Sequence, residues 1–323
     1  MTTMTTNLKL PWDDMAESSR RRVDVLANHN VYWIMDINGR YGIYIESAKK
    51  FVSEKLTISL NGIEVIKRNA QSGIGELILL LNIKEDSQIF CKLCEDLIST
   101  VELYPDNDGM ISAIEVRLQR WQELLKKSND FAMPIEVQMG LFAELTLLEK
   151  ILFPEVGEEQ AINAWVGPDF DKQDFLLDNA VVEVKSYRTS KGQQVTISSA
   201  QQLYCEKQPL FLVSYGLTRS DNGKTVKDLS SDIKAALSKK SKLLFDIFNL
   251  KLTDYGFIPE LANEPYVGFL IDTARVFRVN ADFPKLTPPM IPSEIPRLKY
   301  SIDLSLCDPF EVDFRSIFTK GYE

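Results

Sequence analysis

The stretch Gln173-Asp-Phe-Leu-Leu-Asp-Asn-Ala-Val-Val-Glu-Val-Lys-Ser186 carries the most information about how the chain folds. Its apolar residues occupy every second position on both sides of Asp178-Asn179, which is the pattern of two strands that share one buried face. We predict that Asp178 and Asn179 form the turn of a β-hairpin, which would place Leu177 opposite Ala180. A longer loop would change this register, and Asp-Asn is a weaker turn signal than Asn-Gly.

The predicted register also places two carboxylates, Asp174 and Glu183, directly opposite each other. Like charges in that position are destabilising unless something compensates them, and a divalent cation would do so. Lys185 follows Glu183 by two residues, so its ammonium group should lie on the same face of the sheet. The two acids and the lysine therefore predict a metal-dependent catalytic site. The alternative is an ordinary solvated sheet face.

Length and composition indicate a globular protein of two or three structural units, since the chain has 323 residues and 45% of them are hydrophobic. No apolar run reaches the ~18 residues that a membrane span requires, and the first residues lack the apolar segment of a signal peptide. We therefore expect a cytoplasmic protein. The net charge of −9 argues against coating nucleic acid by bulk electrostatics, but it does not exclude a nuclease whose catalytic acids are neutralised locally.

Cysteine and histidine usage excludes several kinds of active site. The four cysteines are too few and too scattered for a disulfide framework, so we expect reduced thiols. Cys91 and Cys94 have the spacing of half a zinc site or a redox pair, but no second pair accompanies them, which favours a helix with two half-buried thiols. The single histidine, His29, has no nucleophile motif near it, so Ser-His-Asp and Cys-His catalysis are excluded. The sequence also lacks a phosphate-binding loop for ATP hydrolysis.

The chain is predicted to contain a mixed α/β domain over residues 1–128, a core over 129–250, and a C-terminal subdomain over 251–323 that packs on the core. In the first domain, Asn38-Gly39 marks a hairpin. Further elements are expected there, namely helices over 12–27, 87–101 and 111–127 and strands over 57–60 and 75–81. Arg20-Arg-Arg22 would lie on the first helix, either in solvent or against phosphate.

The core should begin with a helix over 134–153 whose apolar stripe contains Glu144. A carboxylate on an apolar face needs a partner or a metal ion, unless Glu144 lies at the edge of the stripe and reaches water. The hairpin should be flanked by a strand over 161–166, a short helix from Ser198 or Ser199 to 204, and a buried strand over 209–215. One or two helices are expected over 224–250, and strands over 266–271, 275–279 and 299–304.

This order of a glutamate-bearing helix, a strand, an aspartate-bearing strand, a Glu-x-Lys strand, a helix and a strand resembles the αβββαβ core of the PD-(D/E)XK nuclease superfamily. More closely, the chain resembles a family of bacterial PD-(D/E)XK motif proteins from restriction-modification and phage-defence gene clusters. The similarity spans most of the chain and lies at Trp121, 140–145, 174–175, 183–186, 202–203, 283–286 and 299–304. The resemblance implies a restriction-endonuclease-like α/β fold, with the nuclease core over 129–250, an N-terminal mixed α/β unit and a small C-terminal β-containing subdomain.

The resemblance also implies a set of metal ligands. Asp174 and Glu183 would bind Mg²⁺, with Mn²⁺ as a substitute, together with the backbone carbonyl of Val184, and Glu144 would complete the acidic shell. A literal Pro168-Asp169 precedes the hairpin, so Asp169 is an alternative first acid. We prefer Asp174, because the cross-strand register favours it.

By the same resemblance, Lys185 would position or deprotonate the attacking water and stabilise the charge that develops at phosphorus. Gln202 would contact the phosphate backbone or the region around Lys185. The implied protein is a Mg²⁺-dependent endonuclease for double-stranded DNA, the restriction subunit of a defence system. It would work with a helicase-like ATPase and a DNA methyltransferase, and a homodimer is one assembly that the resemblance allows. Two alternatives stay open: a non-catalytic nuclease-fold module that binds DNA or scaffolds a complex, and an unrelated α/β protein with a solvated Glu183–Lys185 salt bridge.

Overall fold

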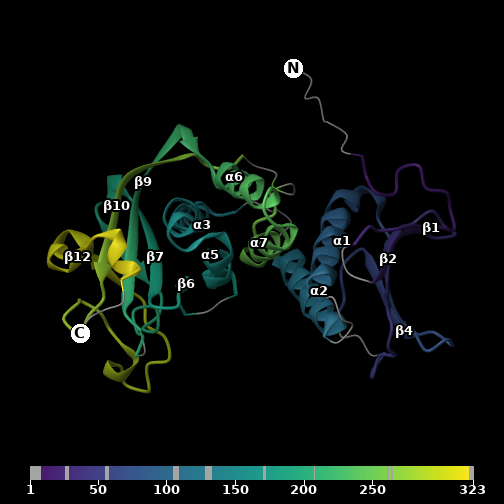
Figure 1. Cartoon of the computed structure of the whole chain (residues 1–323), viewed down its shortest axis with the longest axis horizontal. Coiled ribbons are helices and arrows are strands. Elements are labelled where there is room, and N and C mark those ends of the chain that lie inside the picture. Colours follow the sequence, from purple (N-terminus) through teal and green to yellow (C-terminus); the bar gives the residue numbers. More distant parts are fainter. Residues whose placement is uncertain are drawn as a thin grey trace. The chain divides into compact units, whose positions relative to one another are not determined.

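The computed structural model describes residues 9–25, 29–54, 58–104, 109–127, 133–169, 172–206, 208–259, 262 and 265–319. The chain divides into two compact units, Met1–Phe131 and Ala132–Glu323, which we call unit 1 and unit 2 (Figure 1). Within the described ranges, no helix combines the length and the apolar composition that crossing a bilayer demands. All four cysteines are free thiols, and Cys91 and Cys94 lie buried on one helix of unit 1.

Unit 1 is a five-stranded antiparallel sheet with two helices. The strands, in the order β1-β2-β3-β5-β4, are β1 Ser19–Arg22, β2 Asn30–Met35, β3 Tyr41–Ser47, β5 Gly75–Leu81 and β4 Ile63–Asn69. The helices are α1 Ser87–Glu102 and α2 Met110–Lys127, close to their predicted positions. Alternate strand residues such as Val31, Ile43 and Leu79 are fully buried, as the period of a half-buried strand requires. The Asn38-Gly39 turn is confirmed, with Gly39 at a positive φ of 71°.

The predicted helix over 12–27 is wrong. Ser19–Arg22 is an edge strand, and it pairs antiparallel with β2. Trp12 is buried and donates its indole N–H to the Gly42 carbonyl, which attaches the preceding segment to the sheet. Pairing with the open edge of β2 therefore overrides the local helix signal. The strand expected over 57–60 begins outside the described residues, and Leu60 forms only an isolated bridge with Ile63.

Unit 2 is built on a mixed five-stranded sheet in the order β12-β10-β9-β7-β6. Its strands are β6 Phe175–Leu176, β7 Val181–Arg188, β9 Leu210–Lys224, β10 Phe269–Arg278 and β12 Glu311–Val312. Strands β7 and β9 are parallel, and the other neighbours are antiparallel. The strands β10 and β12 come from the predicted C-terminal subdomain, so that part of the chain is built into the same compact unit and the same sheet as the hairpin.

Two layers cover this sheet. The helices α3 Ile135–Leu147, α5 Glu158–Ala164, α6 Val226–Ser238 and α7 Lys242–Tyr255 lie on one side of β10, β9 and β7 (Figure 1). Val182, Val184 and Val213 pack in the apolar core beneath these helices. Val181 and Leu212 point the other way, into a second core with the small sheet of β8 Gln194–Ile197 and β11 Tyr300–Asp303. Helix α3 continues through a π-helical turn, Leu148–Leu152, into α4 Phe153–Val156.

The predicted hairpin register is confirmed. Phe175 pairs with Val182, and the backbone N–H of Leu177 donates to the Ala180 carbonyl at 2.9 Å. The turn residues are therefore Asp178 and Asn179.

Two flanking elements differ from the prediction. Residues 158–164 form α5 instead of a strand, and only Trp165 bridges to Phe175. The buried residues Ala161, Ile162 and Trp165 have helical spacing, which explains the difference. The predicted short helix up to residue 204 is absent from the described residues there: Ile197 ends β8, where it pairs with Tyr300, and turns follow. The strands expected over 266–271 and 275–279 are one strand, β10, with an irregularity between Ile271 and Thr273.

Candidate active site

The hairpin holds Asp174, Glu183 and Lys185 in mutual reach. Asp174 directly precedes β6, and its Oδ2 accepts a hydrogen bond from the backbone N–H of Val184 at 2.7 Å. The Nζ of Lys185 forms an ion pair with Oε1 of Glu183. The side chain of Glu183 is 0% exposed and that of Lys185 is 17% exposed. The alternative of a solvated salt bridge on the surface is therefore wrong, because the pair is buried.

Glu144 on α3 approaches the hairpin at Gly167. A Cβ atom built on Gly167 would lie 2.9 Å from Glu144 Oε2 and 3.2 Å from Asp174 Oδ1. The two carboxylate oxygens are therefore no more than about 6 Å apart. Any side chain at position 167 would crowd both oxygens, and glycine leaves that space open.

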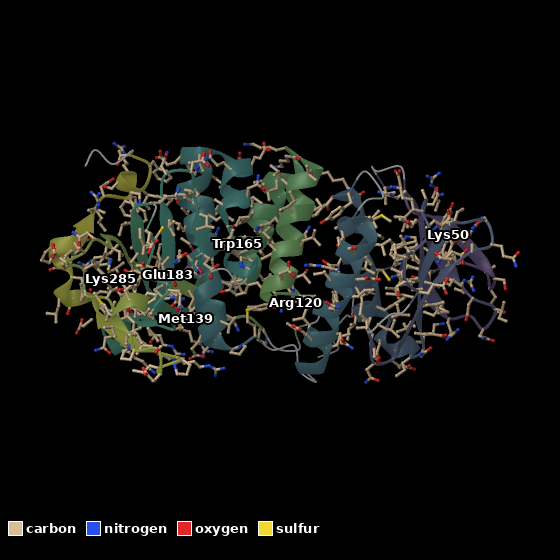
Figure 2. All side chains as sticks on the ribbon, turned by 90° about the horizontal axis from the view of Figure 1, so that it is seen from below. Lys50, Arg120, Met139, Trp165, Glu183 and Lys285 are labelled. Atoms are coloured by element: carbon tan, nitrogen blue, oxygen red, sulfur yellow. The ribbon has the colours of Figure 1, made fainter. Side chains whose placement is uncertain are left out.

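Glu144 is held by two aromatic residues that the sequence analysis did not single out. The indole N–H of Trp165 donates to Oε2 at 2.8 Å, and the hydroxyl of Tyr255 donates to Oε1 at 2.9 Å. Figure 2 shows Glu183 at the strands and Trp165 among the helices, where Trp165 stacks near Phe248 and Tyr255. Because Glu144 is only 5% exposed, the alternative that it reaches water at the edge of its helix is wrong.

Burial raises the pKa values of all three carboxyl groups of the site. Burial, with the negative charge of Asp174 next in importance, raises the pKa of Glu144 to about 8. Burial also raises the pKa of Asp174, and burial together with Asp174 raises the pKa of Glu183 well above its usual range. Burial disfavours the charge of Lys185, but the neighbouring Glu183 and Asp174 raise its pKa overall. Three carboxyl groups thus share one ammonium group in a buried region.

One oxygen in this cluster has no partner. Among the described residues, Oε2 of Glu183 is buried and accepts no hydrogen bond. A buried acceptor left unpaired costs about 1–3 kcal/mol, and more when it is charged. This oxygen and the opening at Gly167 fit a divalent cation, since carboxylate oxygens are the ligands that Mg²⁺ prefers. Asp174 and Glu183 would hold it.

Side chains alone do not complete a metal shell. Within the described ranges, no three His, Cys, Asp or Glu residues converge tightly enough to hold a metal ion. Mg²⁺ is usually bound through one or two carboxylates and keeps several waters, so a backbone carbonyl such as that of Val184 and water would supply the remaining ligands.

Gln202 lies in the turn segment after β8, and its Oε1 accepts from the backbone N–H of Ser198 at 2.7 Å. Among the described hydrogen bonds, none joins Gln202 to the acids or to Lys185. The buried side chain of Gln173 connects this segment to the hairpin, because its Nε2 donates to the carbonyls of Gln201 at 2.6 Å and Tyr204 at 3.2 Å. The side chain of Asp169 lies outside the described residues, so the choice between Asp174 and Asp169 as first acid stays a prediction.

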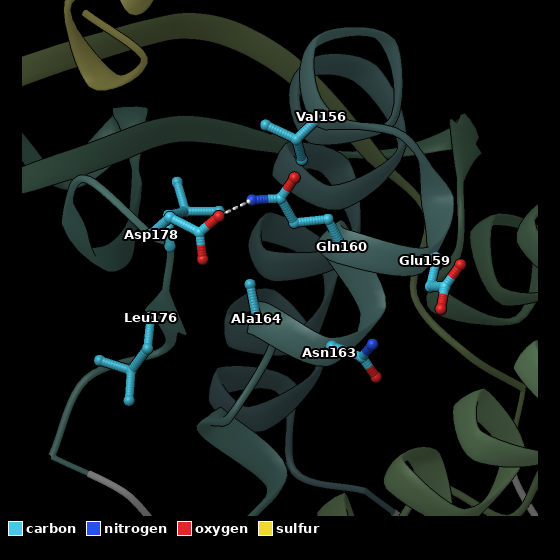
Figure 3. A pocket seen from close by; sticks show the side chains of 8 residues that line it. Val156, Glu159, Gln160, Asn163, Ala164, Leu176 and Asp178 are labelled. Atoms are coloured by element: carbon cyan, nitrogen blue, oxygen red, sulfur yellow. Dashed lines mark hydrogen bonds between the residues drawn. The ribbon is translucent and has the colours of Figure 1, made fainter. Parts of the chain in front are cut away.

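The cavity beside the hairpin turn is a different place. Its volume is about 500 Å³, and it lies between α5 and the turn, where Gln160 donates a hydrogen bond to Asp178 at 2.8 Å (Figure 3). None of the predicted catalytic residues lines it. The cavity therefore carries no part of the proposed chemistry.

The sheet of unit 2 is mixed, and its parallel strand β7 carries Glu-x-Lys opposite a second acid and beneath a glutamate-bearing helix. This arrangement defines an α/β fold of the PD-(D/E)XK nuclease-like class. The sequence model of one protein family, described as "Putative PD-(D/E)XK family member, (DUF4420)", matches residues 6–305. The match covers nearly the whole chain, so the chain belongs to this family. Neither a curated protein nor a solved structure matches it.

Proposed function

We propose that the chain is a metal-dependent endonuclease that hydrolyses phosphodiester bonds of double-stranded DNA, with Mg²⁺ as the cation and Mn²⁺ as a substitute. One observation carries the proposal: the buried carboxylate of Glu183 pairs with Lys185 through one oxygen, and its other oxygen has no partner among the described residues. A divalent cation would compensate the surplus negative charge of the cluster and take up that oxygen.

In this proposal Asp174, Glu183 and the Val184 carbonyl would bind the cation, and Glu144 of α3 would complete the acidic shell. Such a cation polarises a phosphoryl oxygen and lowers the pKa of bound water. Trp165 and Tyr255 fix the carboxylate of Glu144 through both of its oxygens. Partners of this kind orient the groups around a metal, and their loss typically costs 10–100-fold in affinity or activity.

Lys185 positions or deprotonates the attacking water, and it stabilises the charge that develops at phosphorus. Its pKa is raised mainly by Glu183. A cation bound by Glu183 would offset the negative charge beside Lys185, so the proton of Lys185 would become easier to remove. Gln202 would reach the phosphate backbone from the segment that Gln173 ties to the hairpin.

We extend the proposal to the biological setting. The chain would be the restriction subunit of a bacterial restriction-modification or anti-phage defence system, with a helicase-like ATPase and a DNA methyltransferase as partners. A net charge of −9 suits a nuclease that its partners deliver to DNA. Cleavage of both strands would call for two active sites, which a homodimer or paired binding on the DNA would provide.

The test is incubation of the purified full chain with plasmid DNA, modified and unmodified, in Mg²⁺ or Mn²⁺, with and without the products of the neighbouring genes. Cleavage by the wild type and intact plasmid with Asp174→Ala, Glu183→Ala and Lys185→Ala would support the proposal. Intact DNA in every combination would refute the activity. Equal cleavage by the three variants would refute the assigned residues.

A second candidate is a non-catalytic module with a nuclease fold that binds DNA or scaffolds a complex. The ion pair of Lys185 with Glu183 favours it, because the lysine already compensates one acid without a cation. Titration calorimetry with Mn²⁺ separates the two candidates: a catalytic site predicts binding that is lost in Asp174→Ala and Glu183→Ala, and a scaffold predicts no such binding.

A further inference from the structure

Ser214 of β9 is the immediate neighbour of Lys185. The two residues are register partners in the parallel pair β7–β9, so their side chains lie on the same face. This is the face of Val181 and Leu212, opposite to the helix-covered face of Val184. On the other side of Ser214, its antiparallel partner in β10 is Arg275. The hydroxyl of Ser214 therefore lies in a row between two cationic side chains.

The Ser214 hydroxyl is buried without a described partner. The residue is 1% exposed, and Oγ makes no hydrogen bond to any residue that the structure describes. Buried hydroxyls are normally hydrogen-bonded, so an exception calls for an explanation. Ser214 also interrupts the apolar run of β9, where a valine would pack without an unpaired polar atom.

Arg275 does not need this hydroxyl. Its Nε and Nη2 donate to Glu311, Nη2 also donates to Asp308, and Nη1 donates to Gln193 and to the Leu304 carbonyl. All five donors of the guanidinium group are thus accounted for. Lys185 differs, because its ammonium group has three donors and its described partner is Glu183.

We propose that Ser214 is a positioning residue that accepts a hydrogen bond from Lys185 when a cation draws on the carboxylate of Glu183. The inference rests on the proposed function, since it concerns the state in which a cation is bound. In that state the cation competes with Lys185 for the negative charge of the Glu183 carboxylate, and a buried ammonium group short of acceptors is costly. The Ser214 oxygen, on the adjacent strand and same face, supplies a further acceptor and holds Lys185 in place for the attacking water.

The experiment is a double-mutant cycle read by Mn²⁺ titration calorimetry on the full chain, with no activity measurement. Ser214→Ala should weaken Mn²⁺ binding by about tenfold, the size of one hydrogen bond to a charged group. Lys185→Met removes the ammonium group, so adding Ser214→Ala to it should change the affinity less than about twofold. Ser214→Thr, which keeps the hydroxyl, should bind Mn²⁺ nearly as well as the wild type.

Ser230→Ala is the matched control. Ser230 is also buried in unit 2, but its hydroxyl donates to the Lys227 carbonyl on α6 at 2.9 Å. It should leave Mn²⁺ affinity unchanged. Ser214→Cys, which nearly keeps the volume and is a weak acceptor, serves as a second variant if the alanine protein unfolds, and it should also weaken binding.

Equal Mn²⁺ affinity of the wild type and Ser214→Ala overturns the inference and leaves the proposed function standing. A tenfold loss that persists in the Lys185→Met background also overturns it, since Ser214 would then act on the cation without Lys185. If the wild type binds no Mn²⁺, the proposed function fails and this inference fails with it.

Discussion

Both units of the chain bury acidic side chains, and Asp96 of unit 1 and Glu183 of unit 2 differ in how their carboxylate oxygens are hydrogen-bonded. In unit 1, Asp96 on α1 accepts from Arg117 Nε at 2.6 Å, Arg117 Nη2 at 2.7 Å and Trp121 Nε1 at 2.7 Å, so both carboxylate oxygens are paired. In unit 2, Glu183 has one oxygen on Lys185 and one without a described partner. The fully paired Asp96 joins the helices α1 and α2, whereas the partly paired Glu183 keeps an oxygen that can bind a cation.

The charges differ in the same way. Asp96 and Arg117 form a neutral bidentate pair between α1 and α2. Around the hairpin, the carboxyl groups of Glu144, Asp174 and Glu183 outnumber the ammonium group of Lys185. The comparison teaches that burial of an acid is not itself evidence of function. The evidence lies in the uncompensated charge and the unpaired atom.

The largest effect is expected at the partly paired site. Lys185→Met should lower DNA cleavage by about 10²–10⁴-fold, the usual contribution of a group that transfers or directs a proton. The measurement is the rate of plasmid cleavage in Mg²⁺, with circular dichroism to confirm folding. Cleavage within about threefold of the wild type would remove Lys185 from the chemistry.

At the fully paired site we expect a change in stability and none in cation binding. Asp96→Ala should lower the free energy of unfolding of unit 1 by about 3–5 kcal/mol, because it removes the buried carboxylate that accepts two hydrogen bonds from Arg117 and one from Trp121. Tryptophan fluorescence during urea denaturation measures this, since Trp12, Trp33 and Trp121 belong to unit 1 and only Trp165 to unit 2. A loss below 1 kcal/mol, or weaker Mn²⁺ binding, would contradict the contrast between the two acids.

The acid cluster also predicts how stability changes with pH. The pKa of Glu144 is raised from 4.5 to about 8, so folding favours its protonated form. The stability that this preference contributes is fully present below pH 4.5 and is lost as the pH rises through 8. The raised pKa values of Asp174 and Glu183 act in the same direction.

Without divalent cations, unit 2 should therefore lose on the order of 2–4 kcal/mol between pH 5 and pH 8.5, and Glu144→Gln should flatten that slope. Chemical denaturation at each pH, monitored by hydrogen exchange, measures this loss of stability. A flat profile in the wild type would show that the cluster is compensated as fully as Asp96.

The smallest effect concerns the support of Glu144. Tyr255→Phe removes the hydrogen bond to Oε1 and should lower the stability of unit 2 by about 1 kcal/mol. It should also weaken Mn²⁺ binding. Tyr187→Phe is the matched control, because the Tyr187 hydroxyl pairs with Thr273 at 2.8 Å and not with an acid. Equal Mn²⁺ affinities of the two variants would argue that Tyr255 only stabilises the fold.

The sequence predicted what depends on local pattern. Alternation on both sides of a two-residue turn determines the pairing of Phe175 with Val182, and hence the placement of Asp174 against Glu183. The apolar stripe around Glu144 likewise predicted its helix, and burial was one of the two alternatives that the stripe left open. The α/β class followed from these elements.

The rest depends on partners that are distant in sequence. The residue that pairs with Glu144 Oε1, Tyr255, lies 111 positions away, and no local pattern connects the two. Ile197 becomes a strand residue because of Tyr300, and Ser19–Arg22 because of β2. The unpaired oxygen of Ser214 is visible only once its neighbours are known, since a serine in an apolar run has many ordinary explanations.

Gly167 gives the cluster a steric control that is independent of charge. A single methyl group there would lie 2.9 Å from Glu144 Oε2, closer than atoms of that kind approach without displacement. The φ angle of Gly167 is not positive, so its backbone conformation also suits alanine. Gly167→Ala would thus displace the carboxylate of Glu144 or of Asp174 without replacing any ionisable residue. The side chain at position 167, a single hydrogen atom, therefore limits how far apart Glu144 on α3 and Asp174 at the hairpin must lie.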